Sequence, residues 1–182
     1  MNALPALKKL AAGNKRYVAE RYAKINIGFG RRFELSEGQH PFAIILGCSD
    51  SRIPPEIIFD QGLGDLFVIR TAGQVVDDVV LGSIEYAVEH FGVRLIVVLG
   101  HESCGAIKAA LQDEYIPCHI STITNKIKPA VEKAKTQIGD LLINAIIANI
   151  ELNVYKLETL SPILHEALMN KGLLIIGAIY DM

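Results

Sequence analysis

The 182-residue chain has no tryptophan and only three cysteines, Cys48, Cys104 and Cys118. Three cysteines are too few for a disulfide framework, so we interpret them as metal ligands, nucleophiles or core residues in a reducing compartment. No apolar run reaches the ~18 residues that a membrane span needs. The formal net charge of −2 leaves no basic excess for binding nucleic acid. We therefore expect neither a membrane nor a nucleic acid as a partner.

Several short motifs of other enzyme classes are missing as well. A phosphatase-type loop needs an arginine six residues after its cysteine, but the residue at that distance from Cys48 is Pro54. The chain has no C-x-x-C pair, which excludes a thioredoxin-like redox motif. Neither GFGRRF (28–33) nor GLGDLF (62–67) completes the dinucleotide-binding pattern G-x-G-x-x-G, and no G-x-S-x-G elbow is present. The reactive residues must therefore serve another chemistry.

The first residues, MNALPALKKLAAGNKRY (1–17), have the spacing of an amphipathic helix and lack the apolar segment and cleavage site of a signal peptide. We therefore expect a cytoplasmic location. Hydrophobic residues make up 51% of the chain and its mean hydropathy is +0.31, which suggests a subunit interface as well as a core. The length favours a single domain over 1–182, with a helical arm at 1–38 and an α/β core at 39–182.

Four short apolar runs predict strands that are buried on both faces. Their continuous rather than alternating hydrophobicity favours a parallel sheet covered by helices. The runs are residues 42–49, 66–70, 94–101 and 173–180. Helical spacing is found at 75–90, at 104–113 and at roughly 119–170, the last interrupted near Gly139 and at Ser161-Pro162. This alternation predicts an α/β fold with a central, mostly parallel four-stranded sheet flanked by helices.

Reactive side chains follow two of the predicted strands. The first strand runs into CSDSR (48–52), and the third ends in GHESCG (100–105) before a helix. Sites in such sheets form at the carboxyl ends of strands, so Cys48 and His101 lie at one level if the two strands are neighbours. Cys104 follows His101 by about one turn, near a helix N-terminus that favours the thiolate. The three form a candidate Cys₂His zinc set, and three ligands with one open position are typical of catalytic zinc.

Each of these residues also has a purely structural interpretation. A buried cysteine after a strand is usually a small core side chain, and H-x-x-C is by itself a weak metal signal. Asp50 and Arg52 could form an exposed ion pair of little energetic weight. The metal interpretation is stronger because both clusters fall at strand ends of one sheet. An exposed pair would also leave unexplained why Asp50 and Arg52 flank a candidate ligand.

The sequence resembles the β-class carbonic anhydrases. The resemblance is carried by CSDSR (48–52), PEIIFDQGLGDLFVIRTAG (55–73), GSIEYAV (82–88) and GHESCGAIKAA (100–110), and extends more weakly over nearly the whole chain. The pairing of C-x-D-x-R with H-x-x-C about fifty residues later is highly specific to this family. It implies a zinc enzyme that reversibly hydrates CO₂ to bicarbonate and a proton, by attack of zinc-bound hydroxide on CO₂ held in a narrow apolar pocket.

The resemblance also implies roles for individual residues. Cys48, His101 and Cys104 would bind one Zn²⁺ per chain. Asp50 and Arg52 match the catalytic pair, in which the arginine keeps the carboxylate off the open zinc position. Residues that match or suit the substrate pocket are Gln39, Phe67, Ala72, Tyr86 and the backbone N–H of Gly105, and His90 matches a position proposed for proton relay. Helix packing at a dimer interface is the alternative reading of Tyr86 and His90.

In this family the pocket lies at a dimer interface, with some walls supplied by the neighbouring chain. We therefore expect a homodimer, with a tetramer or higher assembly left open. Family members usually continue with an antiparallel edge strand beyond the point where this chain stops, at Met182, so the sequence is either truncated or naturally short. The Trp-Arg-Tyr effector site of one regulated subgroup has no obvious counterpart, because the chain contains no tryptophan.

Two other functions remain open on the sequence alone. One is a CS₂ or COS hydrolase on the same scaffold, which would share the zinc ligands. The other is a non-catalytic protein that binds zinc or bicarbonate, and the presence of both Asp50 and Arg52 disfavours it. The family gives Cys118 no role, so a reactive thiol and an inert core residue are both open.

Overall fold

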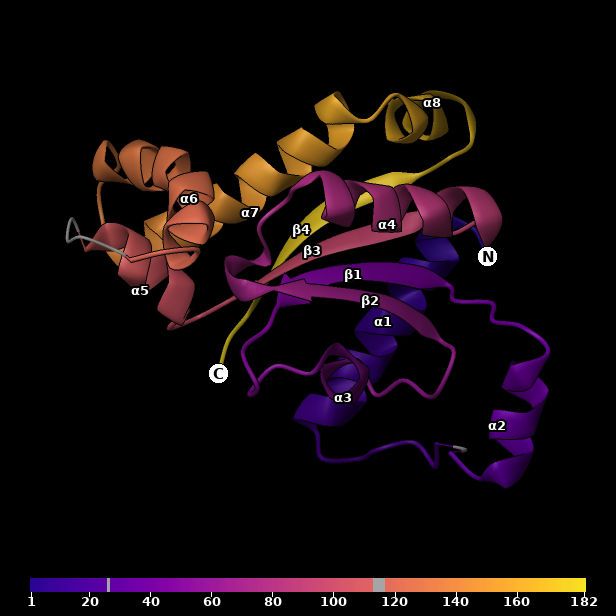
Figure 1. Ribbon diagram of the computed structural model, residues 1–182. Helices are drawn as coiled ribbons and strands as arrows, with labels where there is room; N and C mark the ends of the chain where they lie inside the picture. Colours follow the sequence, from indigo (N-terminus) through magenta and orange to yellow (C-terminus); the bar gives the residue numbers. More distant parts are fainter. Residues whose placement is uncertain (26, 113–116) are drawn as a thin grey trace.

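A four-stranded parallel sheet forms the centre of the molecule (Figure 1). The computed structural model describes residues 1–25, 27–112 and 117–182. The strands lie in the order β2-β1-β3-β4, with bounds Ala43–Cys48 for β1, Leu66–Thr71 for β2, Leu95–His101 for β3 and Leu174–Tyr180 for β4. Every predicted strand is therefore confirmed to within one residue at each end. The predicted sheet is confirmed too, and all its described strand pairs are parallel.

One side of the sheet is covered by a layer of helices (Figure 1). The layer is formed by α4 (Asp78–His90), α7 (Leu141–Leu160) and α8 (Pro162–Asn170). The helices α5 (Gly105–Leu111) and α6 (Ile120–Lys135) pack against α7 beyond the carboxyl ends of the strands. The long helical segment divides where the sequence predicts, and the Ser161 side chain caps α8 by accepting a hydrogen bond from the N–H of Leu164. The helix predicted at 104–113 ends at Leu111, and residue 113 lies outside the described residues.

The other side of the sheet is covered by α1 (Ala3–Val18), which confirms the predicted N-terminal helix. Arg16 of this helix forms an ion pair with the buried carboxylate of Asp60 and so ties α1 to the turn before β2. Two short helices escaped prediction, α2 (Phe29–Ser36) and α3 (Pro55–Ile58). The division into an arm and a core at residue 38 stays a prediction.

The alternation of side chains along β1 divides the core into two layers. Ile44, Leu46 and Cys48 point into the layer beneath α4 to α8, whereas Ala43 and Ile45 pack toward α1. The strand therefore delivers its last side chain, Cys48, to the helix-covered face, where α5 begins. In the described ranges, no helix combines the length and the apolar character that crossing a bilayer requires.

Gly13 marks the closest approach of α1 to the body of the molecule. A Cβ atom at this position would lie 1.8 Å from the carbonyl oxygen of Phe59 and 2.7 Å from Nε2 of Gln61. We expect Gly13→Ala to lower the free energy of unfolding by about 1–3 kcal/mol, because backbone cannot move aside cheaply. Urea unfolding followed by circular dichroism measures this. Gly30→Ala is the matched control, since a Cβ there meets nothing within 4 Å.

Candidate metal centre

The carboxyl ends of β1 and β3 meet, as the sequence predicts. The two strands are parallel neighbours, and Cys48 and His101 are their last residues. Cys104 stands at the N-cap of α5, one short turn after His101. The three side chains are buried, with exposed fractions of 4% for Cys48, 0% for His101 and 1% for Cys104. Their ligand atoms lie within 4.8 Å of one another, so the fold assembles the predicted set.

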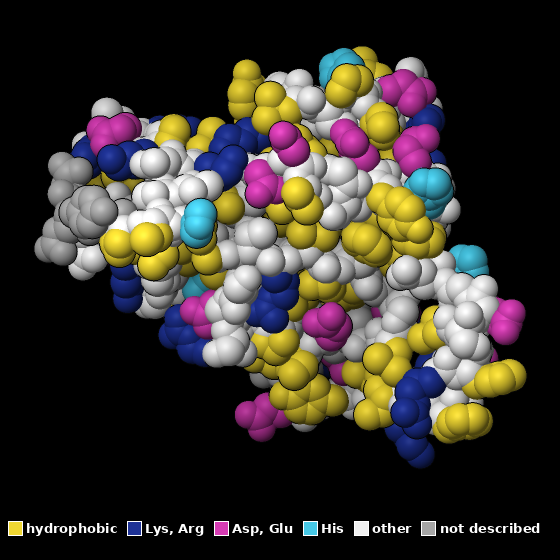
Figure 2. Space-filling model, viewed as in Figure 1, with side chains coloured by type: hydrophobic (Ala, Val, Ile, Leu, Met, Phe, Trp, Pro, Cys, Tyr) yellow, Lys and Arg dark blue, Asp and Glu magenta, His cyan; other side chains and the backbone are white. Residues whose placement is uncertain are grey.

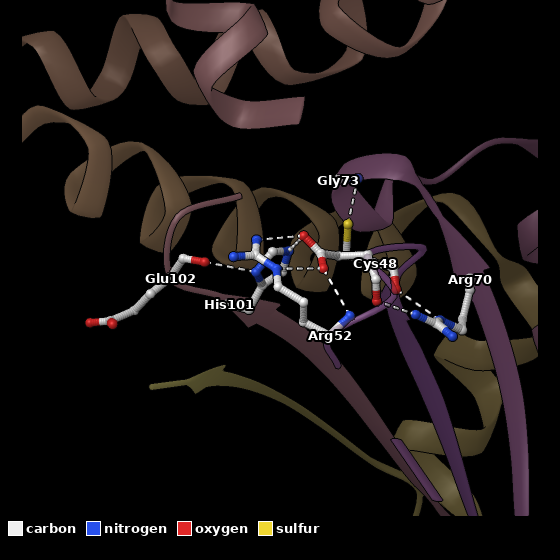
Figure 3. A network of polar contacts seen from close by, with 7 residues as sticks. Cys48, Arg52, Arg70, Gly73, His101 and Glu102 are labelled. Atoms are coloured by element: carbon white, nitrogen blue, oxygen red, sulfur yellow. Dashed lines mark hydrogen bonds and ion pairs between the residues drawn. The ribbon is translucent and has the colours of Figure 1, made fainter. Parts of the chain in front are cut away.

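The orientation of the His101 ring leaves the lone pair of one ring nitrogen available to a metal. Its Nδ1 lies 2.8 Å from the carbonyl oxygen of Glu102 (Figure 3), and because a carbonyl can only accept, the ring proton belongs on Nδ1. The lone pair is then on Nε2, which is buried and has no hydrogen-bond partner among the residues that the structure describes. A buried imidazole nitrogen without a partner, beside two thiols, fits a zinc ion in donor type and number.

The two thiols of the cluster have different proton affinities. A hydrogen bond with the Cys104 thiol lowers the pKa of Cys48 to about 4, against the effect of burial and with help from His101 and the N–H of Gly73. The same contact, together with burial, raises the pKa of Cys104. The surroundings of Cys48 therefore favour its thiolate, the form in which a cysteine binds zinc.

Asp50 lies beside the cluster but is held by Arg52. The guanidinium donates from Nε to Oδ1 at 2.9 Å and from Nη2 to Oδ2 at 2.7 Å, and the backbone N–H of Arg52 also donates to Oδ1 at 3.0 Å. The hydrogen bonds from Arg52 hold the pKa of Asp50 well below its usual range. Asp50 Oδ2 is 4.0 Å from Nε2 of His101, so the carboxylate is within easy reach of an ion on that nitrogen. Arg52 thus holds the carboxylate by a two-pronged pair of hydrogen bonds.

Comparison with known proteins agrees with this geometry. A sequence model of the family described as "Carbonic anhydrase" matches residues 43–182. The chain belongs to the β-carbonic anhydrase family. "Carbonic anhydrase 2" of Mycobacterium tuberculosis is 51% identical over 134 residues, which is 71% of this chain and 65% of that protein. "Carbonic anhydrase" of Mycolicibacterium smegmatis is 49% identical over a stretch of the same length. The matched stretch covers 65% of the length of each of these two relatives.

Solved β-carbonic anhydrases share the fold. A tetrameric β-carbonic anhydrase from Sordaria macrospora has a TM-score of 0.76 and 29% identity, covering 98% of this chain and 90% of its own. The Coccomyxa enzyme in complex with acetazolamide has a TM-score of 0.75 and 27% identity, covering 96% of this chain and 82% of its own. The predicted family and fold are therefore confirmed.

Arg70 contributes to the site although the sequence interpretation passed over it. From β2, its Nε donates to the carbonyl oxygen of Cys48 at 2.8 Å and its Nη2 donates to that of Asp50 at 2.5 Å (Figure 3). The guanidinium therefore fixes the backbone on both sides of Ser49. A charged residue near the end of an otherwise apolar strand was the signal that could have revealed it.

The structure divides the remaining predicted site residues into two groups. Ala72 and Gly105 lie beside the metal ligands. Ala72 follows β2 in the short helix η1 (Ala72–Gln74), whose Gly73 donates its N–H to the sulfur of Cys48 at 3.3 Å. Gly105 is the first residue of α5, directly after a ligand. Both positions agree with the roles that the resemblance implies, and these roles stay predictions.

Gln39, Phe67, Tyr86 and His90 lie elsewhere in the chain. Phe67 pairs with Ile44, four residues before Cys48, so it lies about 13 Å from the metal-ligand level along the strand. Phe91 joins Phe67 to Tyr86, at ring-centroid distances of 6.0 and 5.3 Å. The His90 ring lies tilted beside that of Tyr86, with the ring centroids 4.4 Å apart, and Gln39 precedes the amino end of β1. Phe67 is therefore too far along its strand to line the space over the metal ligands within one chain, and the pocket roles of all four residues stay predictions.

Proposed function

We propose that the protein is a zinc-dependent carbonic anhydrase that catalyses CO₂ + H₂O ⇌ HCO₃⁻ + H⁺. The observation that carries the proposal is the buried set of Cys48, His101 and Cys104, with an unpartnered Nε2 on the histidine. Membership of the β-carbonic anhydrase family supports the same reaction. Three donors leave a fourth zinc position open, as catalytic sites do. When bound, zinc supplies a Lewis acid that lowers the pKa of a water molecule.

Asp50 and Arg52 act together in the proposed reaction. An unpaired Asp50 carboxylate, 4.0 Å from Nε2 of His101, would reach the ion and take the position that water needs. Arg52 prevents this with two parallel hydrogen bonds. The ionised carboxylate can also accept a hydrogen bond from the reacting water and direct its lone pair toward CO₂. Arg70 supports the arrangement by fixing the backbone carbonyl of Asp50.

We propose further that the active unit is at least a homodimer. Phe67, which the resemblance implies as a pocket wall, lies about 13 Å along its strand from the level of the metal ligands, too far to cover them within one chain. Figure 2 shows hydrophobic side chains gathered over α4, where Val79 is 78% exposed and Tyr86 49% exposed. A second chain that packs on this surface can bring its own wall residues over the ligands. Sedimentation equilibrium tests this, and a monomer at micromolar concentration with full activity would refute it.

Stopped-flow measurement of CO₂ hydration by zinc-loaded protein tests the proposed reaction. We expect turnover that depends on one zinc per chain and disappears after chelation. A parallel assay of sulfide release from CS₂ and COS tests the neighbouring chemistry. Sulfide release without CO₂ hydration would replace the proposed reaction by that hydrolysis. Bound zinc with neither activity would indicate a non-catalytic zinc protein.

A further inference from the structure

Two asparagines are completely buried in α7, the helix that packs on β3 and β4. Asn149 and Asn153 are each 0% exposed, and their neighbours in the helix include the buried side chains of Ile146, Ile150 and Leu157. An amide in such surroundings costs free energy unless it is hydrogen-bonded. A buried amide in an apolar helix therefore calls for an explanation.

Asn149 forms a hydrogen bond that reaches the metal centre. Its Nδ2 donates to the carbonyl oxygen of Gly73 at 2.9 Å, across 76 positions of sequence. The N–H of the same glycine donates to the sulfur of Cys48 at 3.3 Å (Figure 3). Gly73 of η1 thus accepts a hydrogen bond from Asn149 at its carbonyl and donates one from its N–H to Cys48, a candidate zinc ligand. Asn153 differs, because its Nδ2 donates to the backbone carbonyl of Asn149 within α7 itself.

The turn between these two hydrogen bonds has an uncommon backbone. Gly73 has φ 69° and ψ 20°, and Gln74 follows with φ 44°, so two consecutive residues are left-handed. For a residue other than glycine, this conformation costs about 1–2 kcal/mol, and surrounding structure must impose it. A Cβ on Gly73 would lie 2.8 Å from Cδ1 of Ile127 and 3.1 Å from Cβ of Ala106, so packing confines the turn on one side. On the other side, the Asn149 amide holds the carbonyl of Gly73 by its hydrogen bond.

We propose that Asn149 is a positioning residue of the metal centre, holding Gly73 so that its N–H stays directed at the sulfur of Cys48. The inference rests on the zinc site of the proposed function. A hydrogen bond to a thiolate draws negative charge from the sulfur and fixes its direction. Without Asn149 the turn can rotate, and the sulfur then loses both its donor and its orientation.

Co²⁺ substitution of the whole chain tests this without an activity assay. The variant is Asn149→Leu, which removes the amide and nearly keeps the side-chain volume. The matched control is Asn153→Leu, which removes an equally buried amide from the same helix but leaves the hydrogen bond to Gly73 intact. The readouts are the thiolate-to-Co²⁺ charge-transfer band and the zinc affinity measured by competition with a chromophoric chelator.

We expect Asn149→Leu to bind zinc about tenfold or more weakly and to move the charge-transfer band to longer wavelength, because the sulfur is more electron-rich. Asn153→Leu should match the wild type in both readouts, whatever it does to stability. Asn149→Ala is the second variant if leucine prevents folding. Unchanged metal binding in the Asn149 variants, or equal losses in the Asn153 control, would overturn the inference alone. A wild-type chain that binds neither metal would overturn the zinc site with it.

Discussion

Replacement of Cys48 by serine is expected to remove zinc and to reduce CO₂ hydration to the background rate. Cys48 is one of the two thiols of the cluster, and its surroundings lower its pKa, whereas a serine hydroxyl stays protonated. The variant would keep a neutral oxygen where the ion needs an anionic sulfur. A metal contributes several kcal/mol of transition-state stabilisation, so its loss alone lowers kcat/KM by at least about a thousandfold.

Cys118→Ser provides the matched control for this experiment. Cys118 is exposed and stands outside the cluster formed by the other two cysteines. We expect it to retain one zinc per chain and wild-type turnover. Zinc content by elemental analysis and stopped-flow hydration should be measured on the same samples. A Cys48→Ser protein that keeps stoichiometric zinc would show that the ion binds elsewhere.

The metal ligands could be predicted from sequence because neighbouring strands of a parallel sheet bring their carboxyl ends together. Continuous apolar runs identify the strands, and the carboxyl ends of neighbouring parallel strands lie at one edge. Cys48 and His101 then follow from their positions at those ends, and Cys104 follows from its place at the start of a helix. The pairing of Asp50 with Arg52 is equally local, since only Ser51 separates them.

The contacts that support the ligands were beyond sequence reasoning for a physical reason. Asn149 reaches Gly73 because α7 packs at one particular rotation against the sheet, and apolar spacing fixes that rotation only coarsely. Arg70 was visible as a charged residue in a strand, but its acceptors depend on the path of the backbone after β1. The short helices α2 and α3 have too few turns to establish a periodic pattern.

The resemblance placed residues in a pocket without saying which chain supplies them. Phe67 is near the amino end of β2, whereas the ligands are at the carboxyl end of the sheet. The register of β1 with β2 fixes this separation within one chain. If Phe67 lines the pocket over the ligands, as the resemblance implies, the proposed second subunit has to supply it. Sequence similarity carries the identity of such residues but not the symmetry that brings them together.

Arg52→Ala is expected to keep zinc and to lose most of the turnover. The side chain holds Asp50 by two hydrogen bonds and lies outside the set of metal ligands. Once released, the carboxylate can reach the ion next to His101 and occupy the open position. We expect kcat/KM to fall by about 10²–10³, corresponding to roughly 3–4 kcal/mol. Arg52→Lys should recover only part of this, because an ammonium group lacks the two-pronged geometry.

Anion binding to the Co²⁺-substituted protein distinguishes a metal whose open position is occupied from a metal whose surroundings have merely changed. In the wild type, thiocyanate should enter the open position and change the visible spectrum, whereas Arg52→Ala should not respond because Asp50 occupies it. The double variant Asp50→Ala/Arg52→Ala should regain the response while remaining poorly active. Arg31→Ala is the control, since that arginine pairs with Glu34 on the surface of α2. If Arg52→Ala bound thiocyanate like the wild type, Arg52 would not be what keeps the carboxylate off the metal.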